Sequence, residues 1–138
     1  ITPGEADILI GFEVAEAMRW TAHVRPGGVA LVNTMRIAPP VVSGGLFPYP
    51  DDPAAAIRAT GLELHAFNAE EIARRIGNMR LINTIMLGAV ADRLPFSADI
   101  LKSAVVNRFR QRKPHLADLN ARAFDEGRAA AGANSQAA

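Results

Sequence analysis

The chain has 138 residues, of which 49% are hydrophobic and 21% charged, a composition typical of one globular domain rather than of a disordered segment. Its formal net charge of +1 gives no indication of a nucleic-acid partner, and no apolar run has the length of a membrane-spanning helix. We therefore expect a cytoplasmic protein that binds neither nucleic acid nor membrane.

The sequence contains no cysteine, so this chain forms no disulfide and supplies no thiolate to a metal ion or an iron–sulfur cluster. Its three histidines, His23, His65 and His115, lack the paired spacing of a metal site on one helix. We predict that each histidine packs in the core or lies on the surface.

The first part of the chain predicts a βαβ unit. The apolar run at residues 8–12 is typical of a strand buried on both faces, and residues 13–24 have the apolar spacing of a helix that begins near Glu13. Residues 25–28 (RPGG) predict a tight break, and residues 29–32 (VALV) predict a second strand. A strand, a helix and a strand in this order favour parallel pairing.

A loop rich in proline and glycine follows at residues 38–53. A short helix is predicted at 54–59, and residues 62–67 (LELHAF) alternate as expected of a third strand. Three strands are fewer than a self-sufficient doubly wound sheet usually has. We therefore expect the natural domain to have further strands before Ile1, so that this chain is truncated at its N-terminus.

The remaining residues predict helices with clear start and stop signals. Asn68 and Ser97 occupy N-cap positions, and Gly77 suits the end of the first of these helices. The predicted helices span 69–76, 79–94 and 98–110, and the last begins at Pro114. The helix at 79–94 is apolar nearly all round, so it is either a central helix, with more sheet around it than this chain supplies, or a helix that a partner covers.

Together these elements predict an α/β fold with three αβα layers, in which a mostly parallel, Rossmann-like sheet is followed by a helical C-terminal part. The expected domain covers residues 1–128. Residues 129–138 (AAAGANSQAA) contain nothing to anchor them and predict a disordered tail.

The chain has no nucleophile elbow, Walker loop, zinc-binding spacing or dinucleotide fingerprint, and we predict no catalytic residue and no metal site in it. Polar residues at the ends of the strands, the prolines of the loop and the polar start of the apolar helix are candidates for contact with a partner or a ligand. These candidates are Glu13, Asn33, Thr34, Pro39, Pro40, Asn78, Arg80 and Asn83. Alternatively, Asn33 and Thr34 cap backbone groups of the loop, and Asn78 is the N-cap of its helix.

The chain resembles the gamma-type domain of the 2-oxoacid:acceptor (ferredoxin) oxidoreductases, and within that family most closely the beta subunit of the indolepyruvate type. The resemblance lies in five segments that follow one another in order: GEADILIGFEVAEAMR, RPGGVALVNT, PPVVS, NAEEIARRIGNMRLINTIMLGAV and LNARAFDEG. It extends from Gly4 to Gly127. The strand and glycine-rich turn with which family members begin have no counterpart here.

This resemblance implies a subunit that supports the oxidative decarboxylation of a 2-oxoacid, such as indolepyruvate or another arylpyruvate, to an acyl-CoA, with the electrons passed to ferredoxin. It places thiamine diphosphate, magnesium and iron–sulfur clusters in a larger partner subunit, so this chain binds no cofactor and is inactive by itself. Coenzyme A and ferredoxin are then partners of the whole complex.

The resemblance also bears on the loop in the segment VNTMRIAPPVVSGG (residues 32–45), which leaves the carboxyl edge of the sheet. Pro39 and Pro40 prevent a regular ladder there, so we interpret this segment as a stiff contact loop that faces the partner subunit. Two other interpretations stay open. The chain is a stand-alone Rossmann-like module that binds a nucleotide or small molecule, or it is a fragment whose exposed apolar surfaces are covered by copies of itself.

Overall fold

Residues 1–38, 40–46, 48–111 and 113–133 are described by a computed structural model of the chain. Their contacts form two units, the first over Ile1–Ala66 and the second from Phe67 onward. Among the described residues, no helix combines the length and the hydrophobicity needed to cross a membrane.

The sheet contains three strands in the order β1 (Ala6–Gly11), β2 (Val24–Asn33) and β3 (Glu63–Phe67). β1 and β2 are parallel, with Ile8 opposite Val29 and Gly11 opposite Val32. Helix α1 (Val14–Trp20) and a 3₁₀ turn (Thr21–His23) connect these two strands. The predicted βαβ unit is therefore confirmed.

The predicted break at residues 25–28 is wrong, because this segment is a bulge inside β2. Ala6 lies opposite Val24 and Ile8 opposite Val29, so the extra residues of β2 are accommodated without ending the strand. Gly27 has a φ of 70°, in the left-handed region that favours glycine. Arg25 Nε also donates to Asp7 Oδ1 of β1 over 2.7 Å, across the bulge. Glycine here permits a local distortion rather than a turn.

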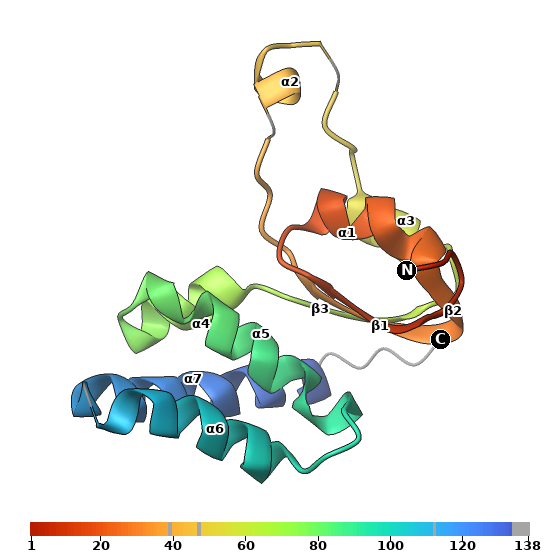
Figure 1. The fold of residues 1–138 in the computed structure, drawn as a ribbon. Coiled ribbons are helices and arrows are strands. Elements are labelled where there is room, and N and C mark those ends of the chain that lie inside the picture. The colour runs from red at the N-terminus through yellow and green to blue at the C-terminus, as the bar shows by residue number, and fades with distance from the viewer. Residues whose placement is uncertain (39, 47, 112, 134–138) are drawn as a thin grey trace. The chain divides into compact units, whose positions relative to one another are not determined.

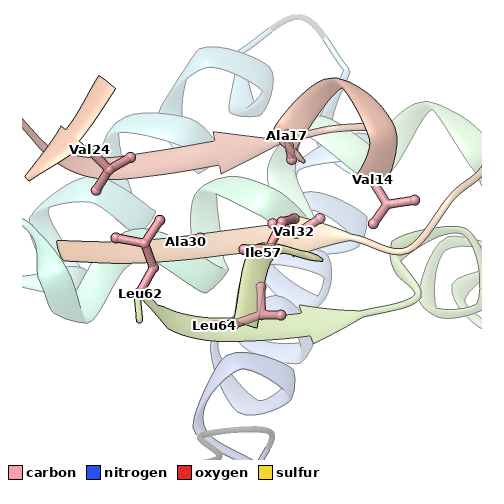
Figure 2. Close-up of a cluster of buried hydrophobic side chains, with 8 residues drawn as sticks. All are labelled: Val14, Ala17, Val24, Ala30, Val32, Ile57, Leu62 and Leu64. Carbon is pink, nitrogen blue, oxygen red and sulfur yellow. The ribbon is translucent and has the colours of Figure 1, made fainter. Parts of the chain in front are cut away.

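One apolar cluster packs the helices of the first unit against the sheet (Figure 2). It joins α1 and α3 (Pro53–Arg58) to β2 and to the β3 region through Val14, Ala17, Val24, Ala30, Val32, Ile57, Leu62 and Leu64. Between β2 and α3 the chain leaves the sheet as a long projecting loop that carries the short helix α2 (Pro40–Ser43) (Figure 1). Glu13, Asn33 and Thr34, three of the predicted contact residues, lie at the edge of the sheet where this loop begins.

The second unit consists of helices whose ends follow the predicted signals. They are α4 (Ala69–Ile76), a 3₁₀ turn (Met79–Leu81), α5 (Ile82–Val90), a 3₁₀ turn (Ala91–Arg93), α6 (Ala98–Arg110) and α7 (Pro114–Ala133). The side chain of Asn68 accepts from the N–H of Glu71, and that of Ser97 accepts from the N–H of Ile100. Gly77 ends α4 with a φ of 96°. All three capping predictions are confirmed.

The apolar segment at 79–94 is the central helix of its unit. Residues buried in α5 include Ile85, Met86 and Ala89, and α4, α6 and α7 pack around it. Helices of the same unit therefore cover this segment. The expectation that the natural domain has a larger sheet stays a prediction. The predicted α/β class is confirmed as a sheet with parallel strands followed by a helical C-terminal part.

Helix α7 runs to Ala133, so the predicted disordered tail is wrong for residues 129–133. These residues are mostly alanine, which has the highest helix propensity, and Ala131 is buried. Residues 134–138 of the predicted tail lie outside the described residues.

Candidate functional site

The candidate site of the first unit lies where β1 and β2 end. Because neighbouring parallel strands end at the same edge of a sheet, Glu13 after β1 and Asn33 at the end of β2 come close together. The long loop also starts at this edge, and the backbone N–H of Val14 donates to the carbonyl of Met35 over 3.1 Å. Both side chains are buried, with 9% of Glu13 and none of Asn33 exposed.

Glu13 is the N-cap of α1 and also binds both ends of the loop. Its Oε2 accepts a hydrogen bond from the N–H of Glu16 over 2.8 Å. Its Oε1 accepts one from the N–H of Ile37 over 3.3 Å, and another from the hydroxyl of Tyr49. One carboxylate thus joins the start of a helix to the two ends of the loop, where it leaves the sheet and where it returns.

Asn33 links the two strand ends through backbone groups. Its Nδ2 donates to the carbonyl of Phe12 over 3.1 Å, and its Oδ1 accepts from the N–H of Met35 over 3.4 Å. The capping alternative is therefore confirmed for Asn33. Whether Asn33 and Glu13 also contact a partner stays a prediction.

Arg36 and Tyr49 complete this network, and sequence reasoning missed both. Arg36 donates to the carbonyls of Pro50 and Asp51 over 2.8 and 3.1 Å, and its guanidinium carbon lies 4.6 Å from the centroid of the Tyr49 ring. A cation over a tyrosine face at this distance is attracted to the ring. The available signal was their position, because Arg36 directly precedes an uncharged segment rich in proline and glycine and Tyr49 lies near the end of that segment.

The electrostatics of this network favour an ionised Glu13. Burial of the carboxyl raises the pKa of Glu13, but hydrogen bonds from the Tyr49 hydroxyl and from three backbone N–H groups outweigh burial, and the pKa lies below its ordinary value. Burial and the neighbouring carboxylate raise the pKa of Tyr49. The pair is therefore a charged carboxylate that accepts from a neutral phenol.

The other loop candidates have less defined surroundings. Thr34 is half-buried at the same edge, and Pro40 begins α2. Pro39 lies outside the described residues. The contact role of all three stays a prediction.

In the second unit, Asn78, Arg80 and Asn83 lie at the start of the segment that leads into α5. The side chain of Asn78 accepts from the N–H of Arg80 over 3.0 Å, which confirms its predicted N-cap role. Arg80 and Asn83 are exposed, and so is Met79, which lies between Asn78 and Arg80. These exposed residues make the start of the segment accessible.

The histidines lie as predicted, in packing or on the surface. His65 is buried, with Nε2 at 2.7 Å from Oε1 of Glu63, and His115 is exposed. His23 lies against Trp20, with the ring centroids 4.9 Å apart, beside an apolar pocket of about 250 Å³. Trp20 is 53% exposed, so it is not a core residue.

No cluster of metal-ligating side chains lies in the described part of the chain. Among the described residues, no three His, Asp or Glu side chains gather as metal ligands, and the sequence has no cysteine. The side-chain contacts observed at the candidate site are hydrogen bonds that hold the helix start and the loop.

Comparisons with known proteins agree with the resemblance seen in the sequence. The family described as "Pyruvate ferredoxin/flavodoxin oxidoreductase" matches residues 1–130. Proteins named "Indolepyruvate oxidoreductase subunit IorB" are 32% identical in Thermococcus kodakarensis and 33% identical in Methanothermobacter thermautotrophicus. These matches cover 92% and 95% of this chain, and 64% and 67% of the relatives. The chain thus spans about two thirds of the length of these relatives.

Two solved structures share the fold. A 2-oxoglutarate:ferredoxin oxidoreductase from Magnetococcus marinus matches 99% of this chain and 22% of its own, with a TM-score of 0.69 and 22% identity. The gamma subunit of a keto/oxoacid ferredoxin oxidoreductase from Geobacter sulfurreducens matches 94% of this chain and 66% of its own, with a TM-score of 0.62 and 24% identity. At this identity the likeness extends to the fold alone.

Proposed function

Because the chain belongs to the pyruvate ferredoxin/flavodoxin oxidoreductase family, we propose that it is part of a subunit of a cytoplasmic 2-oxoacid:ferredoxin oxidoreductase of the indolepyruvate type. In this role it supports the oxidative decarboxylation of an arylpyruvate to an acyl-CoA and carbon dioxide, with the electrons passed to ferredoxin. The observation that carries the proposal is the match to indolepyruvate oxidoreductase subunits over more than nine-tenths of this chain. It favours this function over a stand-alone nucleotide-binding module.

The donor groups of the chain suit a supporting role. With no cysteine in the sequence, this chain supplies no thiolate to an iron–sulfur cluster, and among the described residues no three His, Asp or Glu side chains gather as metal ligands. We assign the iron–sulfur clusters, magnesium and thiamine diphosphate to a larger partner subunit, and we derive no chemical step through them here. The isolated chain is accordingly expected to have no turnover.

Reconstitution tests this proposal. The protein that carries this chain is expressed with and without the larger subunit, and association is measured by size-exclusion chromatography. Turnover is measured as reduction of ferredoxin that depends on both an arylpyruvate and coenzyme A. We expect turnover only when both subunits are present. Failure of the subunits to associate, or full turnover by the larger subunit alone, would contradict the proposal.

A further inference from the structure

The longest stretch of the sequence without a charged residue lies in the projecting loop, not in the core. It covers residues 37–50 (IAPPVVSGGLFPYP). The two next-longest stretches within the folded elements, at 26–35 and 81–91, fall largely in β2 and α5, where many residues are buried. We call the described residues of this stretch (37–38, 40–46 and 48–50) the arm; Figure 1 shows it extending away from the sheet.

The arm exposes large apolar side chains. Leu46 is 73% exposed and Ile37 is 51% exposed. Solvated loops of globular proteins are usually polar, whereas the centres of protein interfaces are depleted of charged residues. The composition and the exposure of the arm therefore both favour contact with an apolar surface of another protein.

The base of the arm is fixed by three side chains, Glu13, Arg36 and Tyr49, which we call the latch. Glu13 accepts from the N–H of Ile37 where the arm leaves and from the hydroxyl of Tyr49 where it returns. Arg36 donates to the carbonyls of Pro50 and Asp51 and covers the Tyr49 ring. The charged side chains of Glu13 and Arg36 thus bring the two ends of the arm together.

Such an arrangement lowers the cost of binding. A long loop with free ends loses conformational entropy when it is ordered against a partner, and a loop already closed at its base loses less. Within the arm, Ser43 Oγ donates to the carbonyl of Ala38 over 3.2 Å. The N–H of Gly45 donates to the carbonyl of Val42 over 2.9 Å. The arm therefore has hydrogen bonds within it as well as at its base.

We propose that the arm inserts against an uncharged, apolar surface of the larger, cofactor-bearing subunit, and that the latch holds the arm in the conformation that binds. The identity of this partner rests on the proposed function, while the latch is a property of this chain alone. Glu13, Arg36 and Tyr49 are positioning residues, because they act through the arm.

A pair of matched substitutions tests the contact. Leu46→Ser removes an exposed apolar side chain from the arm, and Ile100→Ser removes one of similar exposure, 65%, from α6. We expect Leu46→Ser to raise the Kd for the larger subunit at least tenfold and Ile100→Ser to change it less than twofold. Equal effects of the two variants, or no effect of Leu46→Ser, would overturn the proposal.

Tyr49→Phe tests the latch, because it removes the hydroxyl that donates to Glu13 and keeps the ring beneath Arg36. Amide hydrogen exchange of the arm, measured on the chain without its partner, is expected to rise severalfold, and the Kd for the larger subunit is expected to rise with it. Unchanged exchange, or faster exchange with an unchanged Kd, would overturn the positioning role. If the unsubstituted chain does not bind the larger subunit at all, the proposed function itself fails, whereas binding that is insensitive to Leu46 contradicts only the arm.

Discussion

Gly88 of α5 lies against the backbone of Phe124 in α7 so closely that a β-carbon on residue 88 would be 2.0 Å from the Phe124 carbonyl oxygen. The relationship is reciprocal, because a β-carbon on Gly127 would be 1.9 Å from the carbonyl oxygen of Ile85. The earlier residue of α5, Ile85, meets the later residue of α7, Gly127, and Gly88 meets Phe124. The two helices therefore run antiparallel where they cross. Glycine at these two positions sets how near the helices come.

Gly88→Ala should therefore destabilise the second unit. The new methyl group meets backbone, which cannot rotate away, so we expect a loss in the free energy of unfolding of about 3 kcal/mol, at the upper end for overpacking. Gly132→Ala, in the same helix as Gly127, is the control because its β-carbon would meet nothing within 4 Å. The control should be neutral or stabilise by up to about 1 kcal/mol through helix propensity. Urea denaturation of both variants checks this, and equal midpoints would contradict the packing argument.

The buried pair Thr84 and Asn120 should contribute through hydrogen bonding. Thr84 Oγ1 donates to Asn120 Oδ1 over 2.6 Å, and Asn120 Nδ2 donates to the carbonyl of Leu116 over 2.7 Å. Thr84→Val keeps the shape but leaves a buried acceptor without this donor, so we expect a loss of about 1 to 3 kcal/mol. Asn83→Ala, on the exposed side of the same helix, should change stability little. A double-mutant cycle that gives no coupling between Thr84 and Asn120 would show that the bond contributes nothing.

The latch should weaken in acid because the pKa of Glu13 is lowered in the folded chain. A lowered pKa means that this carboxylate stabilises the fold fully above its ordinary pKa, about 4.3 for Glu, and that the stabilisation is lost as the pH falls through the folded-state value. Glu13→Gln should cost about 1.5 to 3 kcal/mol at neutral pH, as expected of hydrogen bonds to a charged group. The difference in denaturation midpoint between the unsubstituted chain and Glu13→Gln should then shrink from pH 7 to pH 3. A difference that stays constant over this range would contradict an ionised latch.

The prolines of the loop give a prediction made from the sequence alone. Replacing Pro39 and Pro40 by alanine frees two backbone torsions and relaxes the restriction on the preceding residues. We expect this variant to fold with an unchanged circular dichroism spectrum but to bind the larger subunit more weakly or to lower the turnover of the complex. Unchanged assembly together with unchanged turnover would contradict this prediction.

Local signals were read correctly from the sequence where neighbouring residues alone determine the outcome. Asn68, Gly77 and Ser97 cap helices as predicted, because a cap is a hydrogen bond or a backbone conformation within a few residues of the helix end. The prediction failed at residues 25–28, where the same glycines that can make a turn make a bulge instead. The neighbouring strand decides between the two, through the pairing that continues on both sides of the bulge.

The sequence by itself determined the parallel βαβ start, the helical C-terminal part and the family resemblance, since periodicity, caps and ordered motifs are carried by residues close together in the chain. Only the tertiary structure decided what Glu13 does, because Tyr49, which donates to it, lies 36 positions away. It also decided that α5 is covered by helices, since the fit of Gly88 and Gly127 depends on two backbones meeting across the unit. Contacts between remote residues depend on how whole elements pack, and no local pattern of residues specifies that packing.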